Sequence, residues 1–217
     1  MALLALTVSI FGHIADSVVD QEAITVLDLQ IANWFNTNHV EPYTSFLLAI
    51  SFIHKVGGMI LLVAALGYWF WRRQQRYWLI ALGVTVLPGM IFNVLLKHIY
   101  QRSRPVFEEP LVTLATYSFP SGHTAAATLF YGLLACYVMI ACKSWSVRLA
   151  TAVFCVVMIF LVAFSRVYLG AHYLSDVLAA MASSVAWLTV CITAVSTLRR
   201  RSAARALANS RADQPPR

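Results

Sequence analysis

Long apolar runs, separated by short polar segments, follow one another along most of the chain. The runs cover residues 1–14, 59–71, 79–96, 124–142, 147–164 and 177–198. A helix needs about 20 predominantly apolar residues to cross a bilayer, so this pattern predicts six membrane-spanning helices. The first run is short, but it lacks a basic start and a clear small-residue cleavage site. We therefore expect a first span there rather than a signal peptide that is removed.

The polar stretch between the first two predicted spans has its own pattern. Apolar residues recur at helical spacing within residues 15–42, at positions Leu27, Ile31, Trp34 and Phe35. This spacing predicts an amphipathic helix that lies at the membrane interface. Residues 46–53 are apolar but too few to span the bilayer alone. The predicted fold is therefore all-α, a six-transmembrane-helix bundle with an interfacial helical segment between the first two spans.

We expect residues 1–201 to form a single transmembrane domain. The remainder, residues 202–217, is small, polar and contains proline. Such a composition offers little apolar surface to bury, and it predicts a disordered cytoplasmic tail.

Basic residues gather at two of the connections between the predicted spans and at the end of the last span. They are Arg72, Arg73 and Arg76, then Lys143 and Arg148, then Arg199, Arg200, Arg201 and Arg205. Short loops rich in Lys and Arg stay on the cytoplasmic side of a membrane. The sequence therefore predicts that both termini are cytoplasmic and that the alternate loops face the exterior.

Composition agrees with this interpretation. Hydrophobic residues make up 60% of the chain and charged residues 12%, whereas soluble domains carry about a quarter charged residues. The formal net charge of +7 would suggest nucleic-acid binding in a soluble protein. Here the basic charge lies beside apolar segments, so we expect no nucleic-acid partner. The four cysteines lie in or at the ends of apolar runs without a C-x2-C pair, so a zinc site or a disulfide framework is not expected.

Three polar groups fall on the predicted outer face. They are Lys97 with Arg104 and Pro105, then Pro120-Ser121-Gly122-His123, then Ser165-Arg166 with His172 and Asp176. Ionisable residues at membrane depth are costly and usually functional. Three cations, two histidines and one carboxylate at one end of a bundle indicate a site for an anion.

Phosphate suits this set of residues. Lys97, Arg104 and Arg166 offer charge-assisted donors to phosphate oxygens. Residues 121–123 directly precede a predicted helix, whose first N–H groups would face the anion, and glycine permits close approach. His172 and Asp176 are spaced i,i+4 and share a helical face. The carboxylate could fix the imidazole tautomer and leave the other ring nitrogen free to attack phosphorus, while His123 supplies a proton.

Each group taken alone has a structural explanation. Lys97 and Arg104 could extend towards lipid headgroups, residues 120–123 could form a turn and a helix cap, and the His172–Asp176 pair could join two helices. Their convergence on one face of a chain with few charges favours a functional site.

The spacings Lys97-x6-Arg104-Pro105, Pro120-Ser121-Gly122-His123 and Ser165-Arg166-x5-His172-x3-Asp176 resemble the three-part signature of the type 2 phosphatidic acid phosphatase superfamily. The resemblance implies that His172 is the nucleophile, Asp176 its partner and His123 the general acid. It also implies that Lys97, Arg104, Ser121, Gly122 and Arg166 bind the phosphate, and that no metal or other cofactor is needed.

The resemblance leaves the substrate open. A bacterial plasma-membrane enzyme with an outward-facing site is expected, acting on a lipid such as undecaprenyl pyrophosphate, phosphatidylglycerophosphate or phosphatidic acid. One alternative is a phosphotransferase that passes the phosphoryl group to another lipid such as lipid A. A second is a transporter or lipid-binding protein whose cations only bind anions. A haloperoxidase of the same superfamily is disfavoured because those enzymes are soluble. The sequence predicts no oligomeric state.

Overall fold

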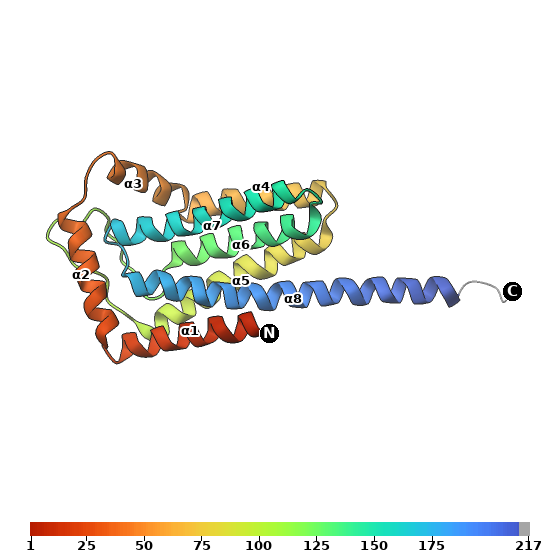
Figure 1. The fold of residues 1–217 in the computed structure, drawn as a ribbon, viewed down its shortest axis with the longest axis horizontal. Coiled ribbons are helices and arrows are strands. Elements are labelled where there is room, and N and C mark those ends of the chain that lie inside the picture. Colours follow the sequence, from red (N-terminus) through yellow and green to blue (C-terminus); the bar gives the residue numbers. More distant parts are fainter. Residues whose placement is uncertain (213–217) are drawn as a thin grey trace.

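The computed structural model describes residues 1–212 of the chain and builds them from eight helices joined by turns and loops (Figure 1). The helices are α1 (Ala2–Val19), α2 (Ala23–Thr37), α3 (Tyr43–Ile53), α4 (Val56–Arg72), α5 (Arg76–Tyr100), α6 (Gly122–Ala141), α7 (Trp145–Tyr168) and α8 (Leu174–Ala212). The all-helical prediction is confirmed.

Five of these helices, α1, α5, α6, α7 and α8, are long and apolar enough to cross a membrane. The number of candidate spans rises to six if α3 and α4, which pass the same test together and are bent by 57° at their junction, are counted as one span. The sequence pattern starts this span at residue 59, or near Gly57, whereas α4 starts at Val56, and it treats residues 46–53, which lie in α3, as a separate short segment. A Cβ at Gly58 would lie 1.8 Å from the carbonyl oxygen of Ile53, so the bend requires glycine there. The first span is also longer than predicted, since α1 continues to Val19.

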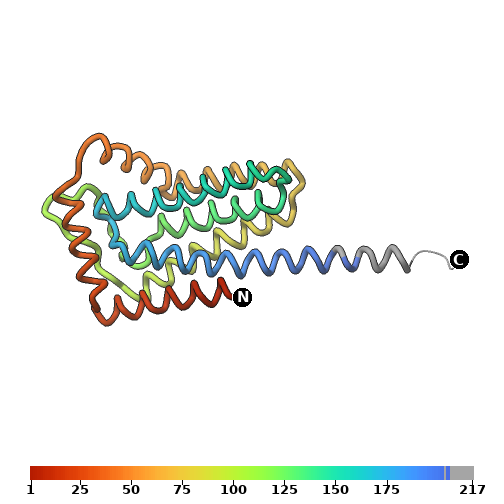
Figure 2. The backbone as a smooth tube through the Cα atoms, viewed as in Figure 1, coloured from red at the N-terminus to blue at the C-terminus, as the bar shows by residue number. Residues whose placement is uncertain are grey.

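Most helices run roughly along one direction, apart from α2, which lies across one end of the bundle, and α3, which is bent by 57° from α4 (Figure 1). The α4–α5 and α6–α7 turns lie at the opposite end, and α8 extends beyond it (Figure 1). The tube view shows α1 running beside α8 (Figure 2). The basic clusters therefore lie at one end of the bundle, and the three polar groups lie at the end that α2 covers.

The centre of the bundle is α6. Small residues at its start, Ala125, Ala126 and Ala127, are buried and let neighbouring helices approach closely. Further along α6, Leu133 and Tyr137 pack with Trp78 and Leu82 of α5. By contrast, α7 exposes a row of large apolar side chains, Val153, Phe154, Val156, Val157 and Phe160, as expected for a helix that faces lipid.

The structure corrects the prediction for the C-terminal tail. Helix α8 continues to Ala212, so residues 202–212 are helical rather than disordered. Residues 213–217 lie outside the described part of the chain.

Candidate active site

The three polar groups come together at the end of the bundle that α2 crosses, where α5 ends, α6 begins and α7 turns into α8 (Figure 1). Helix α5 ends at Tyr100, and its C-cap residue Gln101 adopts a left-handed conformation with φ of 44°, where the chain turns into the loop that carries Arg104. The backbone N–H of Ser121, at the start of α6, donates to the carbonyl oxygen of Asp176, in α8, at 3.1 Å. This bond connects the second polar group to the third.

His172 and Asp176 form a buried pair. His172 lies in the turn between α7 and α8, and Asp176 lies in the first turn of α8. Nδ1 of His172 is 3.3 Å from Oδ2 of Asp176, and both side chains are almost fully buried. The same carboxylate oxygen accepts from the N–H of Tyr173 at 2.9 Å and from the hydroxyl of Ser118.

The contact on the other side of the imidazole fixes the tautomer. Nη1 of Arg104 lies 3.2 Å from Nε2 of His172. A guanidinium has only donors, so Nε2 must accept and carry the lone pair. The ring hydrogen is then on Nδ1, where it faces Asp176. Burial lowers the pKa of His172 to about 3, although the hydrogen bond and the charge of Asp176 oppose this shift. The ring is therefore neutral near pH 7, with Nε2 as an available nucleophile.

The three cations differ in their present contacts. Lys97 donates from Nζ to the carbonyl oxygens of Tyr117 at 2.6 Å and Ser118 at 3.3 Å. Arg104 donates to the carbonyl oxygens of Thr116 at 2.6 Å and Ala171 at 2.5 Å. The loop of residues 101–121 thus holds these two cations close to the turn that carries His172.

Arg166 is 1% exposed, which is rare for an arginine. Its Nη1 donates to the hydroxyl of Ser51, in α3, while Nε and Nη2 are buried without a hydrogen-bond partner among the described residues. Buried donors of this kind are costly unless a ligand satisfies them. These two nitrogens are therefore suited to donate to the oxygens of an anion.

The segment of residues 121–123 begins α6. Ser121 is its N-cap residue, and the first N–H groups of a helix have no carbonyl of an earlier turn to bind. A Cβ placed on Gly122 would lie 3.9 Å from Cε of Lys97. The backbone of Gly122 therefore lies beside Lys97, one of the residues expected to bind phosphate. Nε2 of His123 is buried without a partner among the described residues. No hydrogen bond joins His123 directly to the His172–Asp176 pair in the described part of the structure.

Two openings reach these residues. An apolar groove of about 660 Å³ extends along α4 and α5 and ends at His54, Gly122 and His123. A second cavity of about 520 Å³ is more polar, and its wall includes Lys97, His98, Arg102 and Arg104. The site is thus accessible from an apolar side and from a polar side.

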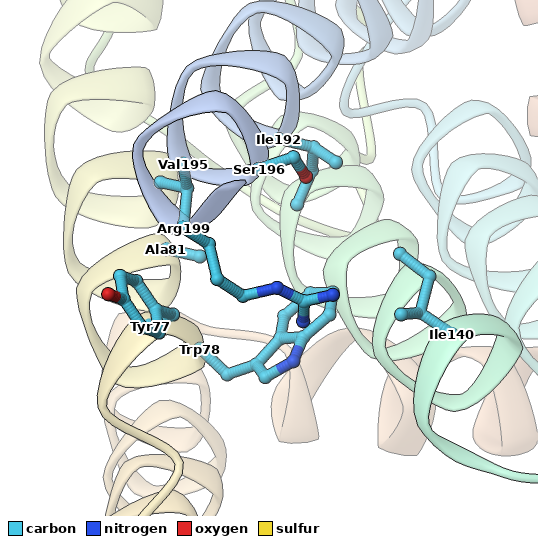
Figure 3. Close-up of a pocket in the computed structure, with 8 residues that line it drawn as sticks. All are labelled: Tyr77, Trp78, Ala81, Ile140, Ile192, Val195, Ser196 and Arg199. Atoms are coloured by element: carbon cyan, nitrogen blue, oxygen red, sulfur yellow. The ribbon is translucent and has the colours of Figure 1, made fainter. Parts of the chain in front are cut away.

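A small cavity at the opposite end of the bundle is not part of the site. Tyr77, Trp78 and Arg199 are among its lining residues, and its volume of about 30 Å³ is close to the volume of one water molecule in the liquid (Figure 3). Within residues 1–212, no three His, Cys, Asp or Glu side chains lie together in a way that could hold a metal ion.

Sequence reasoning missed four residues around the pair: Asp28, Arg102, Ser118 and Ser175. Arg102 forms ion pairs of 2.8 Å with both Asp28 and Asp176. Asp28 is the single carboxylate in α2, and a lone acidic residue in a predicted amphipathic helix is a signal for a cationic partner. Nothing in the spacing identifies Arg102, 74 positions away, as that partner.

Comparison with known proteins assigns the chain to a family. Residues 76–200 match the PAP2 superfamily. The chain is 32% identical over 121 residues to phosphatidylglycerophosphatase B of Bacillus subtilis, which covers 55% of this chain and 58% of that relative. It is 27% identical over 153 residues to undecaprenyl-diphosphatase BcrC of the same organism, covering 69% and 73% respectively.

A solved structure has the same fold. The crystal structure of a transmembrane PAP2-type phosphatidylglycerolphosphate phosphatase from Bacillus subtilis superposes with a TM-score of 0.82 at 24% identity, covering 91% of this chain and 98% of that one. The fold is therefore that of a multi-pass membrane protein. With the family match over more than half of its length, the chain belongs to the PAP2 superfamily.

Proposed function

We propose that this protein is a membrane lipid phosphatase that hydrolyses a phosphomonoester or a pyrophosphate of a lipid through a phosphohistidine intermediate at His172. One observation carries the proposal. The lone pair on Nε2 of His172 faces a cation, near buried donors that have no partner among the described residues, at a site that an apolar groove reaches. Both curated relatives are lipid phosphatases, which supports the same activity here.

The first step is an in-line attack of Nε2 of His172 on the terminal phosphorus. The N–P bond forms as the bond from phosphorus to the leaving oxygen breaks, and His123 gives that oxygen a proton. Asp176 stabilises the charge that develops on the ring through Nδ1–H. Lys97, Arg104, Arg166, the hydroxyl of Ser121 and the backbone N–H of Gly122 bind the phosphate oxygens, where positive charge lowers the barrier most.

The second step releases the phosphate. Water attacks phosphorus, His123 accepts a proton from this water, and the N–P bond breaks to restore neutral His172. The polar cavity beside Lys97 and Arg104 supplies a path for water that does not cross the apolar groove. The residues present perform each proton transfer, so the scheme needs no metal ion.

The apolar groove explains why the substrate is a lipid. Sixteen residues line it, and most of them are apolar side chains of α4 and α5, two helices of the predicted membrane-spanning region. A prenyl or acyl chain in this groove would place its phosphate beside His123 and Gly122. The substrates supported by the relatives are undecaprenyl pyrophosphate and phosphatidylglycerophosphate, with phosphatidic acid as a third lipid of the same chemistry.

The protein then resides in a bacterial plasma membrane, with its active site on the outer side. The basic clusters at the other end of the bundle support this orientation, because such clusters remain in the cytoplasm. Both termini lie on that cytoplasmic side.

The test is a phosphate-release assay on detergent-solubilised protein, with undecaprenyl pyrophosphate, phosphatidylglycerophosphate and phosphatidic acid, in the presence and absence of EDTA. We expect phosphate release from at least one lipid at an unchanged rate in EDTA. Loss of activity in EDTA would contradict the metal-free scheme, and no phosphate release from any lipid would contradict the phosphatase activity.

A parallel experiment uses a radiolabelled pyrophosphate lipid as donor, with and without lipid A. Label that moves to lipid A faster than to water would indicate a phosphotransferase instead.

A further inference from the structure

Arg102 lies between two buried carboxylates, and neither it nor Asp28 belongs to the three-part signature. Its Nη1 donates to Oδ1 of Asp176, and its Nη2 donates to Oδ2 of Asp28, each at 2.8 Å. Its guanidinium also lies 4.2 Å from the centre of the Tyr173 ring. A planar fork with several donors suits such a bridge, whereas a lysine offers only a point charge.

Asp28 is unusual for its helix. It is 1% exposed in α2, whose only other buried residue is Ala32. Its Oδ1 accepts from the N–H of Ser175 at 2.9 Å, and its Oδ2 accepts from the hydroxyl of the same serine. The helix across the end of the bundle is thereby tied to the residue next to Asp176.

The bridge determines how the carboxylate of Asp176 is oriented. Arg102 donates to Oδ1. Oδ2 accepts from the N–H of Tyr173 and from the hydroxyl of Ser118, and it faces Nδ1 of His172. Rotation of this carboxylate would break the contact with Arg102. The Oδ2 atom is therefore held in the position where it can fix the tautomer of His172.

The charges are balanced as well. Burial lowers the pKa of Arg102, but the charges of Asp176 and Asp28 outweigh this effect and raise the pKa above its ordinary value. Arg102 is thus always charged, and Asp28 neutralises it. Asp176 keeps one net negative charge for the imidazolium that forms as His172 attacks.

We propose that Arg102 is a positioning residue that orients Asp176 towards His172, and that Asp28 holds Arg102 in place, so that α2 is part of the catalytic geometry. This inference rests on the proposed phosphatase activity of the same site. The alternative is that the Asp28–Arg102 pair only fastens α2 to the bundle.

The experiment measures kcat and KM for phosphate release from phosphatidic acid in detergent micelles. The variants are Arg102→Gln, Arg102→Lys and Asp28→Asn, with Glu109→Gln as a matched control on an exposed acidic residue of the same loop. Loss of a residue that orients a catalytic group typically costs 10- to 100-fold, so we expect kcat of Arg102→Gln to fall by about this factor while KM stays within about twofold. Arg102→Lys should recover part of the loss, because it retains one charged contact.

Asp28→Asn keeps an oxygen for the N–H of Ser175 but loses the charge that holds Arg102. Its kcat should fall at unchanged KM, and the double variant Asp28→Asn/Arg102→Gln should be no slower than Arg102→Gln alone, since Asp28 acts through Arg102. Inorganic phosphate should inhibit every variant with the constant of the unmodified protein, which shows that the phosphate-binding cations are intact.

The outcomes are distinct. Two results for Arg102→Gln would overturn the inference: a kcat within twofold of the unmodified protein, or a raised KM with unchanged kcat. The Asp28–Arg102 ion pair would then only attach α2 to the bundle. If Arg102→Gln does not fold, Asp28→Asn decides by the same criteria. Absence of phosphate release from the unmodified protein on the full lipid panel would instead reject the proposed function.

Discussion

Nη1 of Arg104 lies 3.2 Å from Nε2 of His172, so a cation contacts the lone pair that the proposed attack requires. The same guanidinium binds the carbonyl oxygens of Thr116 and Ala171, which keep it beside the nucleophile. In the proposed mechanism, this guanidinium turns from Nε2 to a phosphate oxygen as the substrate binds. Arg104 would then act both on the resting state of His172 and on the bound phosphate.

Arg104→Lys tests this relationship. The substitution retains a positive charge but loses the planar fork that can contact two oxygens at once. Removal of one donor to a developing oxyanion costs about 100- to 1000-fold in kcat, and we expect a loss in that range here. Steady-state kinetics on phosphatidic acid give the measurement. Lys143→Arg, an exchange of two cations at the opposite end of the bundle, serves as the control and should have no effect.

His172→Ala should abolish turnover while the protein remains folded. The other histidine of the site, His123, has no hydrogen bond to Asp176 in the described part of the structure, so it lacks the carboxylate that orients His172. The phosphate-release assay gives the activity, and the thermal unfolding temperature in detergent gives the integrity of the fold. His13→Ala, at an exposed histidine of α1, is the control. Full residual phosphate release from His172→Ala would remove His172 as the nucleophile.

The sequence predicts the spans well because their signal is local. Runs of apolar residues define α5, α6 and α7 to within a few positions, and the amphipathic spacing around Ile31 identifies α2. The sequence does not identify α3 and α4 as one bent apolar unit, because each of the two apolar runs is too short to cross a bilayer alone. It also fails after Ser202, where Ala, Arg and Leu favour helix although their composition looks disordered.

The candidate site is likewise only partly predictable from the sequence. His172 and Asp176 are one helical turn apart, so their pairing follows from spacing alone. The Arg102 bridge joins residues that are far apart in sequence, and only the packing of α2 against the end of the bundle brings them together. The Arg166 donors that have no partner among the described residues are likewise invisible in sequence, because they depend on how the surrounding helices pack against the guanidinium.

The turn that carries His172 depends on Gly170. This glycine has φ of +65°, and a Cβ would lie 2.6 Å from the Phe107 ring. Gly170→Ala should therefore lower stability by about 1–2 kcal/mol through the left-handed conformation alone, with a further cost from the displaced ring. Thermal unfolding in detergent measures the loss, and kcat should fall because the turn shifts. Gly12→Ala, where no atom lies within 4 Å of the new Cβ, should be neutral or stabilising.

Acid should destabilise the fold through His172. Burial lowers its pKa to about 3 from an ordinary value of 6.5. Between these two pH values the unfolded chain binds a proton at this ring and the folded protein does not, so stability declines as the pH falls from 6.5 towards 3. Thermal unfolding at pH 7.5, 6, 5 and 4.5 measures the decline. The slope should be smaller in His172→Gln, whose side chain does not titrate, and equal slopes in the two proteins would contradict the assignment.

The apolar groove provides the last prediction. Gly83 lines it, and no atom lies within 4 Å of a Cβ placed there, so a larger side chain would enter the groove without disturbing the packing. Gly83→Phe should displace part of a bound lipid chain. Loss of about two buried methylene groups corresponds to about 1.6 kcal/mol, or roughly a tenfold higher KM. Dioleoyl phosphatidic acid should show this increase, whereas the dihexanoyl lipid, whose short chains need less of the groove, should show little change. Gly12→Phe, in α1 and outside the groove, should change the KM of neither lipid. An equal rise in KM for both lipids in Gly83→Phe would mean that the groove does not hold the lipid chain.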